Sequence, residues 1–104
     1  MSDITNLSTI DVAVSNYIAV VTMNNPPVNA QNRQFHDDLT LAFDVLSDRD
    51  DVRSIVLTGA GKCFSAGADI KGRASSKPDL GDHWSHSRRV RECFYSIMEC
   101  RKPV

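Results

Sequence analysis

The sequence has no long hydrophobic run. Its apolar stretches are much shorter than the roughly 20 residues that a membrane-spanning helix needs. Residues 1–6 show neither the pattern of a signal peptide nor that of an arginine-rich transit peptide. We therefore expect a cytoplasmic protein that makes no membrane contact.

There is no excess of charge of either sign. The 12 lysine and arginine residues nearly balance the 13 aspartate and glutamate residues, which gives a formal net charge of -1 at pH 7. A chain this close to neutrality creates no long-range field that attracts nucleic acid or an anionic membrane. We expect neither as a partner, and any anionic ligand has to be held by local groups.

The sequence lacks cysteines at short, paired spacing, which argues against the sites that such pairs form. Cys63, Cys93 and Cys100 are odd in number and include no Cys-x-x-Cys motif, so neither a disulfide framework nor a zinc site is indicated. His83 and His86 have no third metal ligand nearby and are expected at the surface. We expect reduced thiols, no bound metal, and Cys93 and Cys100 on one buried side of a helix.

The chain is long enough for one domain with a modest core, since 41% of its 104 residues are hydrophobic. The segments that carry strand or helix periodicity cover residues 9–14, 17–23, about 32–47, 54–58 and about 82–100. The first two are strands of a hairpin, and the middle segment is a helix with its N-cap within residues 29–32. The run at 54–58 is continuously apolar, as expected of a strand covered on both faces.

Polar residues outside these patterns are expected to face solvent. Residues 72–82 are rich in lysine, serine, glycine and proline without periodicity, which predicts an exposed, mobile loop. In the last helix, Val90, Phe94, Ile97 and Met98 are expected on its apolar side.

Charged neighbours on the first predicted helix are also expected at the surface. His36, Asp37 and Asp38 are adjacent in sequence, as are Asp50 and Asp51 just beyond the helix. Side chains of adjacent residues diverge, so neither pair of carboxylates can flank one bond as an acid and base pair would. We expect all five residues on solvated faces.

The most informative segment follows the predicted strand at 54–58. It contains Gly59-Ala60-Gly61 and then Ser65-Ala66-Gly67-Ala68-Asp69-Ile70, just before a short expected helix. Small side chains let a ligand approach the main chain, and the first N–H groups of a helix lack internal partners. Such donors can stabilise a developing negative charge. Taken alone, however, the same residues can simply allow a tight turn to pack.

Three motifs in order carry a resemblance to a known family. They occupy residues 23–30 (Met-Asn-Asn-Pro-Pro-Val-Asn-Ala), residues 51–59 and residues 65–70. Together they resemble the N-terminal half of the crotonase family, the enoyl-CoA hydratases and isomerases, over about residues 9–104. The resemblance implies an α/β, crotonase-like β-β-α spiral core, present here only in its N-terminal part as a single partial domain over residues 1–104.

The resemblance also implies roles for individual residues. Ala68 matches one of two backbone N–H donors that hold the thioester oxygen, so it is the expected catalytic residue. The residues expected to bind substrate along the coenzyme A track are Val28, Ala30, Ala66, Ala68, Asp69, Ile70 and Lys71. Asp69 can equally cap the short helix. The second donor, a glycine, and the catalytic carboxylates are expected beyond residue 104, so we expect this chain to be a fragment.

The implied function is enoyl-CoA hydration or isomerisation of acyl-CoA thioesters in fatty acid metabolism. No cofactor is expected to stay bound, because coenzyme A enters as part of the substrate. Crotonases assemble as trimers or hexamers, so the resemblance implies a homo-oligomer. The alternative is a truncated, non-catalytic module that binds coenzyme A or mediates oligomer contacts.

Overall fold

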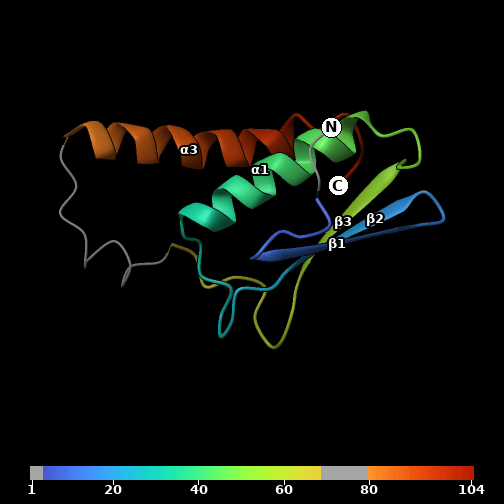
Figure 1. Cartoon of the computed structure of the whole chain (residues 1–104), viewed down its shortest axis with the longest axis horizontal. Helices are drawn as coiled ribbons and strands as arrows, with labels where there is room; N and C mark the ends of the chain where they lie inside the picture. Colours follow the sequence, from blue (N-terminus) through green and yellow to red (C-terminus); the bar gives the residue numbers. More distant parts are fainter. Residues whose placement is uncertain (1–3, 69–79) are drawn as a thin grey trace.

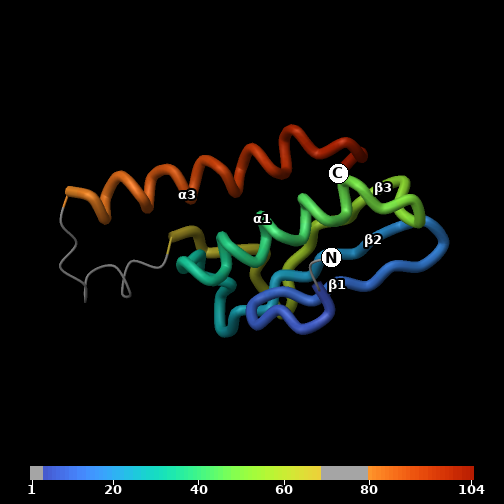
Figure 2. The backbone as a smooth tube through the Cα atoms, turned by 45° about the horizontal axis from the view of Figure 1, so that its top comes forward, coloured from blue at the N-terminus to red at the C-terminus, as the bar shows by residue number. Residues whose placement is uncertain are grey.

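The structure, a computed structural model, describes residues 4–68 and 80–104. Its elements in chain order are β1 (Ile10–Ser15), β2 (Ile18–Met23), α1 (Arg33–Asp48), β3 (Ser54–Gly59) and α3 (Leu80–Met98). Figures 1 and 2 show α1 between the sheet and α3, so the described part has three layers. The predicted β-β-α-β order followed by a helix is confirmed.

The first two strands form the predicted hairpin. β1 pairs with β2 in antiparallel register, from Ile10 opposite Met23 to Ser15 opposite Ile18. The turn residues Asn16 and Tyr17 have φ angles of 50° and 65°. Two consecutive residues in the left-handed region form the two-residue turn whose twist matches that of the flanking strands.

The sheet continues in parallel from β2 to β3, with Ala19 opposite Ile55. This pairing requires a crossover, which α1 provides. The side of the sheet that faces α1 contributes alternate buried residues to the core. The buried hydrophobic residues of the sheet and of α1 are Ile10, Ala19, Val21, Met23, Ile55, Phe35, Leu39, Ala42, Phe43 and Leu46.

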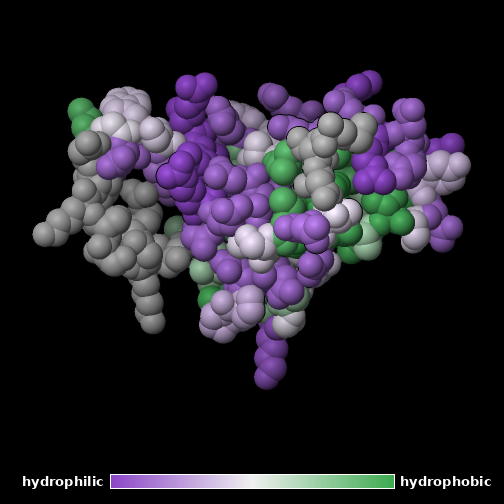
Figure 3. Space-filling model, in the orientation of Figure 1, coloured by the Kyte–Doolittle hydropathy of each residue, from purple (hydrophilic) through white to green (hydrophobic). Residues whose placement is uncertain are grey.

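The opposite face of the sheet corrects one expectation. Val56 of β3 is 48% exposed and Ile18 of β2 is 42% exposed. Residues at alternate positions of a strand point to opposite faces, and α1 covers only one face. Within residues 4–68 and 80–104 β3 is therefore not covered on both faces. In Figure 3 most of the hydrophobic surface visible in that view lies where α1 meets the sheet.

The helix α1 begins and ends as its sequence predicts. Asn32 is the N-cap, and its side-chain oxygen accepts a hydrogen bond from the Phe35 N–H at 2.9 Å. The helix ends at Asp48, one residue beyond the expected Ser47.

The expectation that the charged residues of α1 face solvent is wrong for two of them. His36 and Asp38 are each only 2% exposed. The ring of His36 packs against that of His86 on α3, with 6.2 Å between centroids. The Asp38 carboxylate accepts hydrogen bonds from the Thr9 N–H at 3.0 Å and the Thr9 hydroxyl at 2.6 Å. Because α1 is covered from several sides, its buried face is wider than its apolar stripe.

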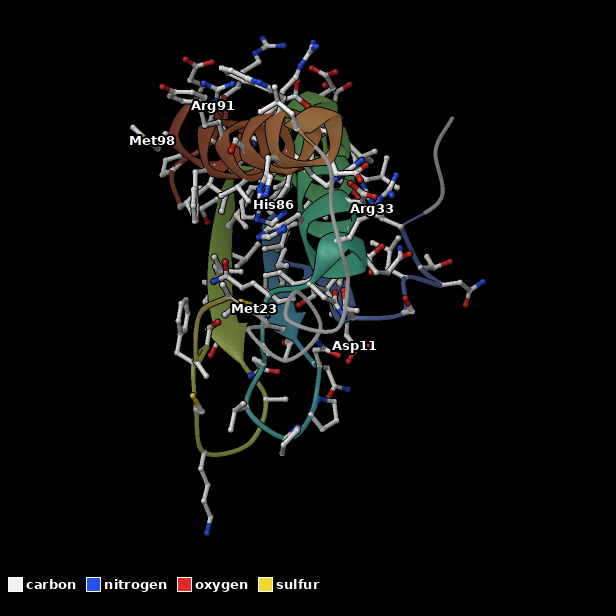
Figure 4. The ribbon with its side chains drawn as sticks, turned by 90° about the vertical axis from the view of Figure 1, so that its left-hand side faces the viewer. Asp11, Met23, Arg33, His86, Arg91 and Met98 are labelled. Atoms are coloured by element: carbon white, nitrogen blue, oxygen red, sulfur yellow. The ribbon has the colours of Figure 1, made fainter. Side chains whose placement is uncertain are left out.

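The helix α3 differs from its prediction in where it begins and in the face it buries. It starts at Leu80, so residues 80–82 form its first turn, and residues 72–79 of the predicted loop lie outside the described residues. Cys93 is buried as predicted and Ile97 packs against the core, but Phe94 is 48% and Met98 is 75% exposed, contrary to the prediction. Figure 4 shows His86 on the side of α3 toward α1, with Met98 on the outer side.

The chain after α3 returns to the sheet. The Ile55 N–H donates to the Pro103 carbonyl at 2.8 Å, and Lys102 Nζ donates to the carbonyls of Arg49 and Val52 at 2.7 and 2.6 Å. These bonds hold the end of the chain against the start of β3. Neither helix in the described parts of the chain is long and apolar enough to cross a membrane.

Candidate functional site

The candidate site lies where two loops leave the same edge of the sheet. One loop follows β2 and the other follows β3, and these strands are parallel neighbours with Met23 opposite Gly59. The Ala60 N–H donates to the Met23 carbonyl at 2.8 Å, which keeps the loops together as they leave the sheet. Both loops can be followed below Met23 in Figure 4.

The two loops then run side by side in parallel. The Ala66 N–H donates to the Val28 carbonyl at 2.9 Å, and the Gln31 N–H donates to the Gly67 carbonyl at 2.7 Å. Gln31 and Ala68 form an isolated parallel bridge. The structure thus brings together four of the predicted site residues, Val28, Ala30, Ala66 and Ala68. The other three, Asp69, Ile70 and Lys71, lie outside the described residues.

Asn29 holds the start of the second loop, and sequence reasoning did not single it out. Its side chain is buried, and its Nδ2 donates to the carbonyls of Cys63 at 2.8 Å, Phe64 at 3.1 Å and Ala60 at 3.2 Å. Its Oδ1 accepts the Asn25 N–H at 2.9 Å. Asn29 has a φ of 54°, which asparagine tolerates better than most residues. The only sequence feature that could have pointed to this role is the position of Asn29, two residues after Pro26-Pro27.

Ser65 holds the end of the same loop. Its hydroxyl donates to the Asn29 carbonyl at 2.7 Å and accepts hydrogen bonds from the Gly67 N–H at 3.1 Å and from Gln31 Nε2 at 3.2 Å. The Gln31 side chain continues inward, since its Oε1 lies 3.3 Å from His36 Nε2. A polar chain therefore links the loop to a buried histidine of α1.

The surroundings of His36 favour the neutral form of its ring. Burial lowers its pKa, His86 and Arg89 lower it further, and Asp37 opposes them. Its buried Nδ1 has no hydrogen-bond partner within the described residues, which fits a neutral ring that carries its proton on Nε2 and donates it to Gln31.

Glycines are required at two points of the loop. A Cβ on Gly59 would lie 2.6 Å from the Phe64 carbonyl oxygen and 2.7 Å from that of Cys63. Gly67 has a φ of 88°, in the left-handed region that favours glycine. The first glycine lets the loop fold back on the end of β3, and the second lets the chain turn just before Ala68.

The Ala68 N–H is available for a ligand as far as the described residues show. Among residues 4–68 and 80–104 no acceptor receives a hydrogen bond from it. It belongs to the same planar peptide as the Gly67 carbonyl, which points toward Gln31. In a trans peptide the C=O and N–H groups point in opposite directions, so the Ala68 N–H points away from the loop after β2. Ala68 is exposed, and the peptide can therefore donate to an oxyanion.

Other parts of the described structure offer no competing centre. Residues 4–68 and 80–104 contain no group of three or more side chains arranged to hold a metal ion. A groove of about 430 Å³ lies between α1 and α3, but charged side chains such as Asp37, Arg89 and Glu92 line it. None of the predicted site residues borders this groove, so we assign it no part in the site.

Comparisons with known proteins point to one family. The family model of enoyl-CoA hydratase/isomerase matches residues 13–104. A probable enoyl-CoA hydratase of Bacillus subtilis is 41% identical over 71 residues, which cover 68% of this chain and 28% of that protein. The mitochondrial Delta(3,5)-Delta(2,4)-dienoyl-CoA isomerase of Pongo abelii is 34% identical over 98 residues, which cover 85% of this chain and 30% of that protein.

The fold agrees with solved structures. An enoyl-CoA hydratase/carnithine racemase from Magnetospirillum magneticum superposes with a TM-score of 0.86 at 28% identity. The match covers 95% of this chain and 38% of that one. The chain thus spans between 28% and 38% of the length of these three proteins.

Proposed function

This chain belongs to the enoyl-CoA hydratase/isomerase family, a crotonase-fold family, and we propose that the complete protein acts on acyl-CoA thioesters as an enoyl-CoA hydratase or isomerase. The reaction passes through an enolate-like intermediate whose oxygen accepts hydrogen bonds from backbone N–H groups. Coenzyme A enters as part of the substrate, and no permanently bound cofactor takes part.

The observation that carries this proposal is the Ala68 peptide. Its N–H has no acceptor among the described residues, although hydrogen bonds to the loop after β2 and to Ser65 hold the residues that precede it. A donor that is fixed before substrate arrives needs no reorganisation when charge develops. This is the property that an oxyanion-binding group requires.

The chemistry uses this donor at one stage. In hydration, water adds to C3 of a 2,3-enoyl thioester, and the electron pair of the double bond moves toward the thioester carbonyl. Negative charge grows on the carbonyl oxygen only as the reaction proceeds, so a fixed N–H stabilises the transition state more than the bound substrate. One such donor contributes on the order of 3 kcal/mol. The second donor and the carboxylates that activate water are expected beyond residue 104.

The coenzyme A arm is proposed to follow the paired loops. Val28 is 40% exposed, and Ala66 lies beside it through the hydrogen bond between their peptides. Apolar walls and main-chain groups suit a thin pantetheine arm. Ala30 belongs to the same surface in this proposal, and Asp69, Ile70 and Lys71 are proposed as further substrate-binding residues.

The test is turnover by the complete protein. Hydration of crotonyl-CoA removes the absorbance of the conjugated enoyl thioester, whereas isomerisation of a 3-enoyl-CoA to the conjugated isomer creates it. Either change, at a rate well above that in buffer, supports the proposal and also separates hydratase from isomerase. A folded protein that catalyses neither reaction contradicts it.

A non-catalytic interaction module is the second candidate, because the described surface exposes large apolar side chains. Val56 on the sheet, and Trp84 and Met98 on α3, are 48%, 66% and 75% exposed. Such surfaces often mark sites of association. A protein without turnover that sediments as a trimer or hexamer, or that binds a CoA thioester in an equilibrium titration, would favour this candidate.

A further inference from the structure

The Ser65 hydroxyl uses its full hydrogen-bonding capacity within the site. A serine hydroxyl has one donor and two acceptor positions. Its proton goes to the Asn29 carbonyl at 2.7 Å, and its oxygen accepts from the Gly67 N–H at 3.1 Å and from Gln31 Nε2 at 3.2 Å. Any rotation of the hydroxyl breaks at least one of these bonds, so its orientation is fixed.

Gly67 is the residue whose orientation this hydroxyl controls. Its N–H donates to Ser65, and its carbonyl accepts the Gln31 N–H at 2.7 Å. The peptides on both sides of Gly67 are therefore held, and the second of them carries the Ala68 N–H. Without these bonds glycine has a wide choice of backbone conformations, and the direction of the Ala68 N–H would vary with them.

Gln31 is itself oriented by α1. Its Oε1 faces Nε2 of the buried, neutral His36 at 3.3 Å, so its Nε2 is left to face Ser65. A side-chain amide with its oxygen toward a donor and its nitrogen toward an acceptor satisfies both neighbours. The helix thus supports the loop through Gln31.

We infer that Ser65 is a positioning residue, which aims the Ala68 N–H at the thioester oxygen by fixing the Gly67–Ala68 peptide, with Gln31 as its support. This inference rests on the proposed function. Ser65 touches no reacting atom and acts only through that peptide. The direction of the donor matters most when charge has developed on the oxygen, so loss of the hydroxyl lowers kcat more than it raises KM.

The experiment compares Ser65→Ala and Ser65→Thr with wild type in the complete protein, by steady-state kinetics on the enoyl-CoA that the wild type converts. A misdirected oxyanion donor gives Ser65→Ala a kcat about 10- to 100-fold below wild type, with KM changed by less than about threefold. Ser65→Thr keeps the hydroxyl and recovers most of kcat.

Two further variants complete the experiment: one is a control, and the other is a substitute test in case Ser65→Ala does not fold. Ser96→Ala removes a serine hydroxyl that donates to the Cys93 carbonyl at 2.6 Å within α3, away from the loop, and is expected to leave kcat unchanged. If Ser65→Ala fails to give a cooperative melting transition, Gln31→Leu removes one partner of the hydroxyl and lowers kcat in the same direction, by a smaller factor.

Each outcome decides a separate point. A folded Ser65→Ala with the kcat of wild type overturns the inference, and so does a Ser65→Thr as slow as Ser65→Ala. A wild-type protein without turnover contradicts the proposed function, and this inference then fails with it.

Discussion

Asn29 donates a hydrogen bond from its side-chain amide to the Cys63 carbonyl at 2.8 Å, across 34 positions of the chain. The same Nδ2 lies within hydrogen-bonding distance of the Ala60 and Phe64 carbonyls. One buried amide therefore holds the first half of the loop that carries Ala68, and the packing of that loop depends on a residue from the other loop.

Replacing Asn29 by aspartate should destabilise the protein strongly. The side chain keeps its size, but an acceptor then faces three carbonyl oxygens that have lost their donor. We expect the free energy of unfolding to fall by at least about 2 kcal/mol, the cost of leaving buried polar groups unpaired. Denaturant titration measures this change.

Asn24→Ala is the matched control for that variant. Asn24 is exposed, and its Nδ2 donates to Asp11 at 3.2 Å. Its loss should change the free energy of unfolding by less than about 0.5 kcal/mol. Equal effects of the two substitutions would contradict the role given to Asn29.

Gly59→Ala should displace the loop after β3. The added methyl group would approach the carbonyl oxygens of Cys63 and Phe64 at 2.7 and 2.6 Å, and backbone atoms cannot move away as a flexible side chain can. We expect a loss of about 1–3 kcal/mol of stability, as for other overpacked sites. At Gly61, by comparison, a Cβ meets nothing within 4 Å, so alanine there costs only the strain of a φ of 80°, about 1 kcal/mol. Thermal melting of both variants shows which substitution costs more stability, and we expect the larger loss at Gly59.

His36 should make stability depend on pH. Its pKa in the folded protein is lowered by burial and by the nearby His86 and Arg89, against the attraction of Asp37. Between this lowered pKa and about 6.5, the usual value in an unfolded chain, the unfolded state binds more protons. Stability is thus fully present above about pH 6.5 and is lost as the pH falls through the folded pKa.

His36→Gln isolates this contribution, because every other titrating group is shared with wild type. The free energy of unfolding should fall less steeply between pH 7 and pH 5.5 in the variant than in wild type. If the free energy of unfolding fell equally steeply with pH in both proteins, His36 would not be buried as a neutral ring in the folded state.

Cys93 should be unreactive in the folded protein. Burial raises its pKa to about 11, although a hydrogen bond with Thr40 opposes the shift. Only the thiolate is a good nucleophile, so at pH 8 we expect alkylation of Cys93 to be about a hundredfold slower than that of a free cysteine. Mass spectrometry of peptides after iodoacetamide treatment compares it with Cys63 and Cys100, which are partly exposed. Rapid labelling of Cys93 before unfolding would contradict the packing of α3 on α1.

The parts of the fold that depend on local sequence could be predicted. The hairpin follows from two strands separated by a short polar turn, and α1 follows from an N-cap at Asn32 and the apolar spacing after it. These signals act between residues that are close in the chain. The burial of His36 and Asp38 could not be predicted, because Thr9 and His86, which pack against them, are distant in sequence.

The candidate site shows the same division. The resemblance carried by three motifs indicated Val28, Ala30, Ala66 and Ala68, and the structure places them on paired loops, while their roles stay predictions. It did not indicate that Asn29 and Ser65 support these loops. Their hydrogen bonds join residues up to 36 positions apart, and no local pattern encodes such partners.

The amide proton of Ala68 tests the central claim most directly. Its chemical shift can be measured by nuclear magnetic resonance in the complete, ¹⁵N-labelled protein, with and without saturating butyryl-CoA, a thioester that cannot be hydrated. If the Ala68 N–H binds the thioester oxygen, its resonance moves downfield on saturation, while that of Gly67, which already donates to Ser65 at 3.1 Å, changes little. An Ala68 resonance that stays in place while other residues of the paired loops respond to the bound ligand would contradict the account.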